Sequence, residues 1–413
     1  MSENSFNTEV VRQCLRQLGA SFRTKELSQH PLMLARHQEL VNRRNYHATV
    51  GTYLSRHCSD VVRVDIGTNE DGALWSNRLG VEAVDVTHRP TPKTRDADDA
   101  TSAESVTAGF GTGTQRASKK SFTARMRLHQ SWYREVVLQL PPGKGPHAGS
   151  TEVRGSMLRP EDAQRGSNFL TPEIYRVVRE RLQEGGRNVE PFRLLHNMLS
   201  SQPMCFNLFG PLVRDLALAT QVFQTVPELE VDRVLAVKLE FAPVPVEEYL
   251  ADGTSFDAYV DYAHRDGSCA FVGIETKLTD GFSRKLCDTP AYRRWMQGPR
   301  APWRPEAASR VTDVEHNQLW RDHLLAIAMR DHPTQRYGHG ALMLVRHPLD
   351  DSGAAIARGY RQLLREGDPS FIDAPMDQLV ERWRAAFGAD ERRAWLSSFS
   401  QRYLALVDSQ AFR

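Results

Sequence analysis

The chain has 413 residues, of which 40% are hydrophobic and 25% charged, enough for one large or two ordinary domains with apolar cores. Its formal net charge is only +2, so the overall charge names no partner, and a nucleic-acid-binding protein would have to localise its positive charge. The five scattered cysteines exclude a Cys-x-x-Cys zinc site or a disulfide framework, and no signal peptide or membrane-spanning run is visible, which indicates a reducing, cytoplasmic setting without a membrane partner.

The first part of the chain is predicted to form a separate N-terminal region over residues 1–88. Residues 31–58 carry apolar positions typical of helices, and strands are predicted at 61–67 and 81–88. Residues 89–121 are rich in Thr, Ser, Ala, Gly and Asp and almost lack large apolar residues, which is typical of a flexible linker or long loop. A second folded domain is therefore expected over residues 122–413.

The second domain is predicted to begin with helices and to continue with a sheet. Residues 124–140 form a strand or a helix, and helical patterns follow at 170–184, 189–201 and 211–226, the first with Thr171 as its cap and Pro172 at its first position. Strand patterns at 234–243, 255–264 and 269–278 follow, the last two joined by a hairpin turn. The second pattern alternates, which predicts Phe256, Ala258 and Val260 on one face and Asp257, Tyr259 and Asp261 on the other. A helix at 317–330, a strand at 340–348 and further helices complete an α/β fold.

Three polar residues on the predicted meander form the candidate site. Glu275 and Lys277, two residues apart on one strand, point to the same face, and pairing with the preceding strand can bring Asp257 beside them. The sequence leaves two readings open, a surface ion pair on an edge strand or half of a metal-dependent site. Two converging carboxylates repel each other unless a cation lies between them, and oxygen ligands suit Mg²⁺ or Mn²⁺. Such a site with a nearby lysine fits phosphodiester hydrolysis.

These residues resemble the signature of the PD-(D/E)XK nuclease superfamily, which has a restriction-endonuclease-like core of helix, three-strand meander, helix and strand. Asp257 in FDAYVDY takes the place of the first acid, and Glu275 and Lys277 in GIETKLTDGFS take the places of the Glu-x-Lys. Phe256 stands where the motif has proline, a position that varies widely. With NMLSSQPMCFNLFGPL (197–212) and NQLWRDHLLA (317–326), the resemblance extends from about His129 to the C-terminus and favours a bacterial group of such proteins.

The resemblance implies a Mg²⁺-dependent nuclease, with Mn²⁺ as the other candidate ion. Asp257 and Glu275 would bind the metal, and Lys277 would assist the attacking water. DNA is the implied substrate, and restriction of foreign DNA is a role that the same analogy suggests. The rival hypotheses are a nucleic-acid-binding or scaffold protein that uses this fold without cleaving, and a metal-dependent hydrolase of another phosphate-bearing substrate. The N-terminal region could read DNA sequence or modification, or bind a protein partner or a second copy of the chain, and its sequence does not tell which.

Several further residues have both a functional and a structural reading. Gln318 opens the helix after the sheet, where related nucleases place a polar residue near the site, but it could lie on the surface. Arg321 could contact phosphate or pair with a carboxylate. Glu240 could be a third acid or a solvated strand residue. Glu135 could project from a helix toward the site, but a structural salt bridge with Arg134 or another nearby base is favoured. The histidines, including His316 and His323, are expected to be ordinary core or surface residues because no HxxxH or HExxH spacing occurs.

Two basic stretches are candidates for contact with nucleic acid. One runs from Ser105 to Arg134 without any Asp or Glu. The other follows the Glu-x-Lys and is predicted to be a loop in which aromatic residues, Trp295 and Trp303 among them, alternate with basic ones. Its alternative is a solvated loop whose tryptophans pack on the core. The residues assigned to nucleic-acid binding are Lys285, Arg293, Arg294 and Arg321.

Overall fold

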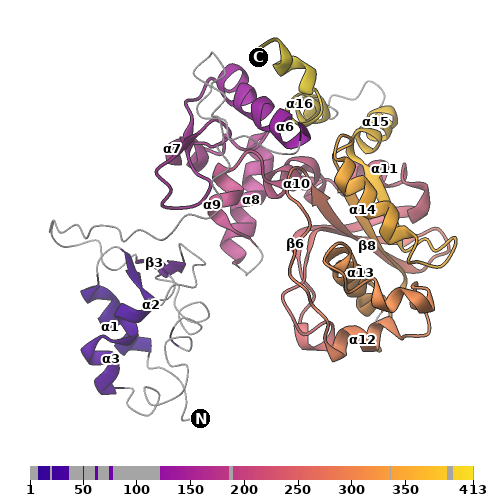
Figure 1. The fold of residues 1–413 in the computed structure, drawn as a ribbon, viewed down its shortest axis with the longest axis horizontal. Helices are drawn as coiled ribbons and strands as arrows, with labels where there is room; N and C mark the ends of the chain where they lie inside the picture. Colours follow the sequence, from indigo (N-terminus) through magenta and orange to yellow (C-terminus); the bar gives the residue numbers. More distant parts are fainter. Residues whose placement is uncertain are drawn as a thin grey trace. The chain divides into compact units, whose positions relative to one another are not determined.

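The computed structural model describes residues 8–18, 21–36, 50, 61–63, 74–77, 121–185, 189–334, 336–387 and 394–412. The chain divides into two compact units, Met1–Ala100 and Thr101–Arg413 (Figure 1). The predicted linker 89–121 lies outside the described residues, except for its last residue. Among the helices within the described ranges, none combines the length and hydropathy needed to cross a bilayer.

The first unit contains short helices and a small sheet. Its described elements are α1 (Thr8–Gln17), β1 (Ser21–Arg23), α2 (Thr24–Ser28), α3 (Pro31–Arg36), β2 (Val61–Arg63) and β3 (Leu74–Asn77). The predicted strand at 61–67 is present in part as β2, whereas the strand predicted at 81–88 lies outside the described residues. The buried apolar side chains come from α1, α2, α3 and the helical residue Val50, so this unit has a core of its own.

The second unit is built on a five-stranded sheet with the order β10-β9-β8-β7-β6. The strands β6 (Val231–Phe241), β7 (Phe256–His264) and β8 (Cys269–Lys277) form an antiparallel meander. Helix α13 (Asn317–Arg330) then leads to β9 (Tyr337–Arg346), which runs parallel to β8. The predicted strands and the predicted helix 317–330 are therefore present. Strand β10 (Phe371–Pro375), parallel to β9, was not predicted because its apolar run is short and ends in proline.

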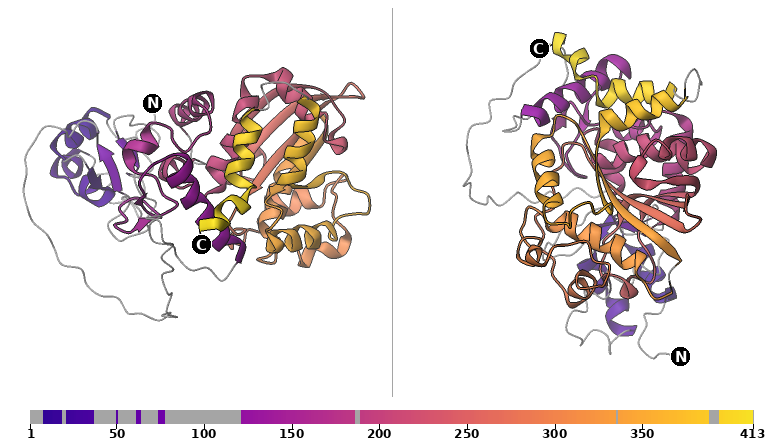
Figure 2. Two further views of the ribbon diagram at one scale, coloured as in Figure 1. Left: turned by 90° about the horizontal axis from the view of Figure 1, so that it is seen from above. Right: turned by 90° about the vertical axis from the view of Figure 1, so that its right-hand side faces the viewer.

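Helices cover both faces of this sheet (Figure 2). One face carries Val260 and Val272 and packs against α10 (Ser201–Phe209), α11 (Leu216–Phe223), α15 (Met376–Phe387) and α16 (Ala394–Tyr403). The other carries Tyr259 and Phe271 and packs against α12 (Pro290–Met296), α13 and α14 (Asp351–Arg361). Because neither face is open to solvent along its length, a charged residue on a central strand must lie inside the protein.

The face assignment predicted for Phe256 is wrong. The alternation of β7 placed Phe256 with Ala258 and Val260, but Phe256 packs in the cluster on the α13 face. The reason is Gly273 on β8, where an added Cβ would lie 2.4 Å from the Phe256 ring. The missing side chain at Gly273 leaves the space that this ring fills.

The helices before the sheet position residues that reach the site. They are α6 (Ser121–Trp132) with its π-helical continuation (Tyr133–Val137), α7 (Pro160–Gln164), α8 (Pro172–Glu184) and α9 (Pro191–His196). Helix α8 starts as predicted, with the Thr171 side chain accepting a hydrogen bond from the Ile174 N–H. The predicted helix 189–201 is broken, because Asn197 is extended and ends α9, and the Ser200 side chain caps the start of α10. In place of the predicted helix 211–226, a 3-10 turn precedes α11, which Asp215 caps.

Candidate active site

Glu275 and Lys277 form an ion pair on the central strand of the sheet. Strand β8 has neighbours on both sides, so these residues do not lie on an edge. The Lys277 Nζ lies 2.8 Å from Glu275 Oε1, and each side chain is only 8% exposed. The structure therefore excludes the surface-ion-pair reading. A buried ion pair in this position needs further partners to offset the cost of removing both charges from water.

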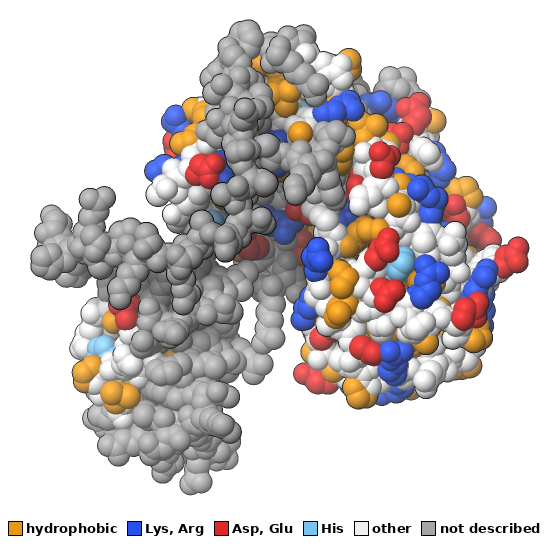
Figure 3. Space-filling model, in the orientation of Figure 1, with side chains coloured by type: hydrophobic (Ala, Val, Ile, Leu, Met, Phe, Trp, Pro, Cys, Tyr) orange, Lys and Arg blue, Asp and Glu red, His pale blue; other side chains and the backbone are white. Residues whose placement is uncertain are grey.

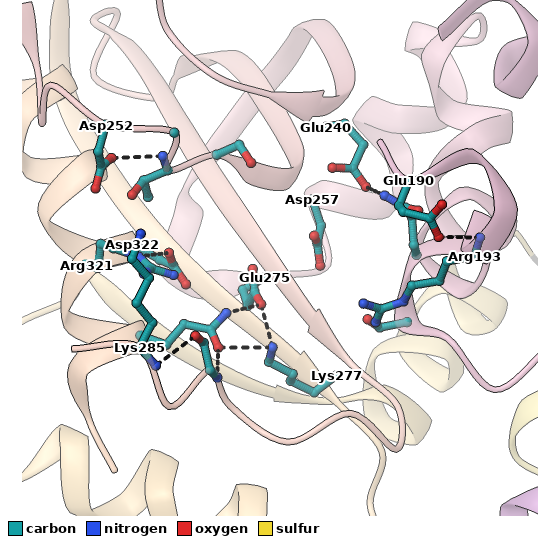
Figure 4. A pocket seen from close by; sticks show the side chains of 17 residues that line it. Glu190, Arg193, Glu240, Asp252, Asp257, Glu275, Lys277, Lys285, Arg321 and Asp322 are labelled. Atoms are coloured by element: carbon teal, nitrogen blue, oxygen red, sulfur yellow. Dashed lines mark hydrogen bonds and ion pairs between the residues drawn. The ribbon is translucent and has the colours of Figure 1, made fainter. Parts of the chain in front are cut away.

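Asp257 faces the same cavity from the neighbouring strand (Figure 4). Strand β7 pairs with β8 through Ala258 and Ile274, so one step farther in this register Asp257 lies beside Glu275. Its carboxylate Oδ2 accepts hydrogen bonds from the backbone N–H of Thr276 at 2.8 Å and from the Thr276 hydroxyl at 2.7 Å. Thr276 thus fixes the orientation of Asp257.

Helix α13 completes this wall of the site with Gln318. Its Nε2 donates to Glu275 Oε1 at 2.7 Å, and its Oε1 accepts from Lys277 Nζ at 3.3 Å and from the Ser283 N–H at 2.6 Å. The amide therefore bridges the two members of the ion pair, and the surface reading of Gln318 is wrong. One turn later on the same helix, Asp322 is 2% exposed, and its Oδ2 has no hydrogen-bond partner within the described part of the chain.

Glu240 lies on the opposite wall and is also buried. Its side chain accepts a hydrogen bond from Gln202 Nε2 at 2.8 Å, and it is 5% exposed, so the solvated reading of this residue is wrong. The backbone carbonyls of Leu239 and Glu240 accept from the Arg181 guanidinium at 3.1 and 2.9 Å. Arg181 therefore holds the end of β6 at the position where Glu240 enters the cavity.

The cavity that these residues line has a volume of about 450 Å³ and contains more buried acid than buried base. Six carboxylates line it, of which four come from β6, β7, β8 and α13: Glu240, Asp257, Glu275 and Asp322. Lys277 is the buried cation among them, whereas Lys285 and Arg321 approach from the loop after β8 and from α13. Figure 4 shows Asp257 and Glu275 between the wall of Glu240 and the wall of Asp322.

The clustering perturbs the protonation of the acids. Burial, with repulsion from Glu275, raises the pKa of Asp257 to about 7. Burial raises the pKa of Glu240 well above its ordinary value, with a further contribution from Asp257. Burial and the nearby Glu275 do the same to the pKa of Asp322. Burial opposes the charged form of Lys277, but the attraction of Glu275 and the other acids outweighs it and raises its pKa.

This donor set fits a hard divalent cation. The ligand atoms offered are carboxylate oxygens, with neither thiolate nor imidazole among the lining residues. Crowding of carboxylates raises their pKa values, so that without a cation they bind protons near neutral pH. A divalent cation among them would relieve their mutual repulsion. Asp257 and Glu275 are the residues that could hold such a cation, and Glu240 faces them across the cavity.

Comparison with known protein families agrees with this geometry. A family model of the PD-(D/E)XK nuclease superfamily matches residues 117–405. The chain belongs to this superfamily. No curated protein and no solved structure matches the chain significantly. The residues that resemble the superfamily motif are Asp257 at the start of β7 and Glu275 and Lys277 at the end of β8, with Phe256 in the place of the proline.

Asp322, Gln202 and Thr276 were missed by sequence reasoning although they contact or line this superfamily site. Asp322 had a usable signal, because it lies four residues after Gln318 and therefore on the same face of α13. Thr276 lies between Glu275 and Lys277 and reaches Asp257 with its backbone N–H as well as its hydroxyl. Gln202 had no signal in the sequence, because α10 meets the end of β6 only through the tertiary fold.

The structure separates the four predicted nucleic-acid-binding residues into two pairs. Lys285 and Arg321 line the cavity. Arg293 instead forms an ion pair with Asp288, with Nε 2.7 Å from Oδ1, and Arg294 stacks over Trp295. Neither residue lines the cavity. On the face of this unit seen in Figure 3, Lys and Arg are interspersed with Asp and Glu.

The two predicted basic stretches differ from expectation in their structure. In the second, residues 290–296 form α12 rather than a loop, and the Trp303 indole is buried and donates to the Tyr360 hydroxyl. Trp303 is therefore part of the core and closed to base stacking. In the first, Arg134 is 1% exposed, donates to the Gly155 carbonyl at 2.8 Å and pairs with Glu135 as expected.

None of the histidines that the structure describes in the second unit lines the candidate site. His323 is a buried core residue, as predicted, with its ring nitrogens hydrogen-bonded to the hydroxyls of Tyr360 and Ser370. Burial lowers its pKa to about 3, so it stays neutral. His316 is also buried. Asp266 directly follows β7 and forms a hydrogen-bonded group with His264 and His339. His264 ends β7, seven residues along the strand from Asp257.

Proposed function

We propose that the chain is a divalent-metal-dependent nuclease that hydrolyses phosphodiester bonds of DNA. The observation that carries this proposal is that Asp257, Glu275 and Lys277 line one cavity that contains an excess of buried carboxylates. Membership of a nuclease superfamily supports the reaction type. The preference for DNA comes from the superfamily and from two of the cationic side chains that line the cavity, Lys285 and Arg321.

Asp257 and Glu275 would hold the ion, with Mg²⁺ or Mn²⁺ as the candidates. A bound ion of this kind lowers the pKa of water and offsets negative charge on a phosphate. Hydrogen bonds within the protein orient both carboxylates without a bound ion. Thr276 holds Asp257 through two hydrogen bonds, and Gln318 holds Glu275 through one.

Lys277 would act on the attacking water or on the phosphate. Its ammonium group has three N–H donors, of which Glu275 and Gln318 accept two. The third can donate to an oxygen atom that enters the cavity. Because its pKa is raised, the group is charged at neutral pH and can stabilise negative charge that develops during phosphodiester cleavage.

Lys285 and Arg321 would hold the phosphates next to the reacting one. Lys285 is exposed on the loop after β8, and Arg321 is half-buried on α13, where its guanidinium contacts the Cys287 sulfur at 3.6 Å. They therefore offer one exposed and one partly buried positive charge. Contacts of this kind bind the nucleic-acid backbone without reading its sequence.

Cleavage of plasmid DNA and of single-stranded oligonucleotides tests the proposal. We expect cleavage with Mg²⁺ or Mn²⁺, none with EDTA, and a loss of at least a hundredfold in Lys277→Ala. Lys238→Ala is the matched control, because Lys238 lies exposed on β6 outside the cavity lining. If Lys277→Ala cleaves as fast as the wild type, a contaminant is responsible and the proposal is wrong.

The same experiment separates the non-cleaving alternative. DNA binding that weakens with salt, without any cleavage under these metal conditions, would assign the chain to the binding class. A role in restriction of foreign DNA follows from the superfamily resemblance. Phage plating on cells that express the wild type or Lys277→Ala tests that role, and equal plating on both would count against it.

A further inference from the structure

The first unit has a distinctive order of elements. The chain runs from α1 through the short strand β1 to the helix pair α2 and α3, then through the helical residue Val50 to β2 and β3. Only His30 and the residue before it separate α2 from α3. Helix α1 contacts α3, and α2 contacts both β1 and α3, so the helices form one layer (Figure 1).

The three strands pair in an order that differs from their order in the chain. The antiparallel sheet has the order β1-β3-β2, so β3 lies in the middle. Phe22 of β1 lies opposite Trp75 of β3, and Val62 of β2 lies opposite Ser76 of β3. The hairpin strands β2 and β3 thus return to pair with the strand that precedes the helix pair.

From this arrangement we propose that the first unit is a winged-helix module that binds duplex DNA. A helix, a strand, a helix-turn-helix pair and a closing hairpin, with strand order 1-3-2, form the winged helix-turn-helix, in which a helix enters the major groove beside the hairpin. The proposal names duplex DNA as the substrate of the proposed nuclease, and this part of it rests on the proposed function. The binding itself does not depend on cleavage.

The positive charge of the first unit lies in the segment that carries its helices, whereas the unit Met1–Ala100 as a whole contains 13 Lys and Arg and 13 Asp and Glu, a net charge of zero. Residues 8–63 contain nine Lys and Arg but only four Asp and Glu, a net charge of +5, whereas the whole chain has +2. The rest of the chain is therefore net negative. Positive charge concentrated on the segment that carries the helices is what binding to phosphates requires.

Duplex DNA fits this unit better than a single strand does. An α-helix with its side chains is about 10–12 Å across, which matches the major groove of B-DNA. Single-strand binding modules instead present aromatic residues on an open sheet or groove. Within the described residues, the sheet of this unit has three short strands, of 3, 3 and 4 residues, and these strands offer little surface for stacked bases.

Binding of the full-length chain to a labelled DNA duplex tests the module. Fluorescence anisotropy is measured with the Lys277→Ala protein in EDTA, so that no cleavage occurs. Two charge-reversal pairs are compared with this parent: Lys25→Glu with Arg36→Glu, and Arg43→Glu with Arg44→Glu. Lys25 and Arg36 belong to α2 and α3, and Arg43 and Arg44 come from the basic sequence that follows.

We expect at least one pair to weaken the affinity tenfold or more and to make the slope of log K against log salt shallower by about 2. The control pair is Arg358→Glu with Arg382→Glu, two exposed arginines on α14 and α15, which should change neither quantity. Unfolding midpoints of all variants are compared, and glutamine versions replace any glutamate pair that lowers them.

The outcomes separate this proposal from the cleavage proposal. If the proteins that carry either N-terminal pair of substitutions bind duplex DNA as tightly as the parent does, the first unit does not bind DNA. Binding of another protein would then be the better hypothesis for this unit. Cleavage is measured separately with the wild type and Mg²⁺. If the wild type cleaves DNA but neither N-terminal pair of substitutions changes binding, the nuclease proposal stands and the winged-helix proposal is wrong. If the substitutions weaken binding but the wild type does not cleave, the winged-helix proposal stands and the nuclease proposal is wrong.

Discussion

Replacing Asp257 with asparagine should make the metal-free protein more stable at pH 8. The wild-type carboxylate must be charged at that pH although it lies among other acids, and its pKa of about 7 expresses this penalty. The asparagine side chain has nearly the same shape and no charge. Its carbonyl oxygen can still accept the hydrogen bonds from the N–H and hydroxyl of Thr276.

The size of the effect follows from the pKa. An ordinary aspartate has a pKa of 3.8, and the difference from about 7 corresponds to about 4 kcal/mol. Asp257 is only partly buried and faces a cavity that water can enter, so we expect about half of this, ~2 kcal/mol. The sign is fixed by proton binding. Between pH 4 and 7 the folded wild type retains a proton that the unfolded chain has lost, so its stability falls as the pH rises.

Urea unfolding in EDTA at pH 4, 6 and 8 measures the difference. The free energies of unfolding of wild type and Asp257→Asn should be close at pH 4 and separate as the pH rises to 8. Asp232→Asn, which changes an exposed aspartate on β6, should show no such separation. Mg²⁺ should stabilise the wild type at pH 8 but not Asp257→Asn. The reasoning would be refuted if Asp257→Asn were less stable than the wild type at pH 8. It would also be refuted if the difference between their free energies of unfolding did not change with pH.

Three further changes test other parts of the site. Gln318→Ala should lower the cleavage rate about 10- to 100-fold, because Glu275 and Lys277 lose their bridge, and single-turnover kinetics at saturating metal would measure it. Arg321→Ala should raise the KM for DNA several-fold and make its salt dependence shallower, whereas Arg293→Ala should leave both unchanged, because Arg293 is paired with Asp288. Gly273→Ala should destabilise the fold by about 1–3 kcal/mol in urea unfolding, because its Cβ would meet the Phe256 ring, and an equally stable variant would contradict this packing.

Local sequence patterns were enough to predict the strands that carry the motif. Alternation along 255–264 and 269–278 and the turn between them predicted β7 and β8. They also predicted that Asp257, Glu275 and Lys277 would share a face, and the cavity contains all three. The position of Gln318 at the start of α13 followed from the helical period and from the superfamily resemblance.

Properties that depend on distant parts of the chain were not available from such patterns. Whether β8 is an edge or a central strand depends on the pairing of β9, which lies about 60 residues later. The burial of Glu240 depends on Gln202 of α10 and on Arg181 of α8. Lone charges give no local sign of their partners, so Arg293 and Arg321 looked alike in sequence although one is paired on the surface and the other lines the cavity.

The crowded carboxylates give the cavity the character of an ion exchanger. Near neutral pH some of its carboxyl groups are protonated, and a cation that binds there must displace those protons. The divalent cation proposed above should therefore bind more weakly as the pH falls below about 7, the pKa of Asp257. Acidity and magnesium supply would then be antagonists that together decide when the protein can act.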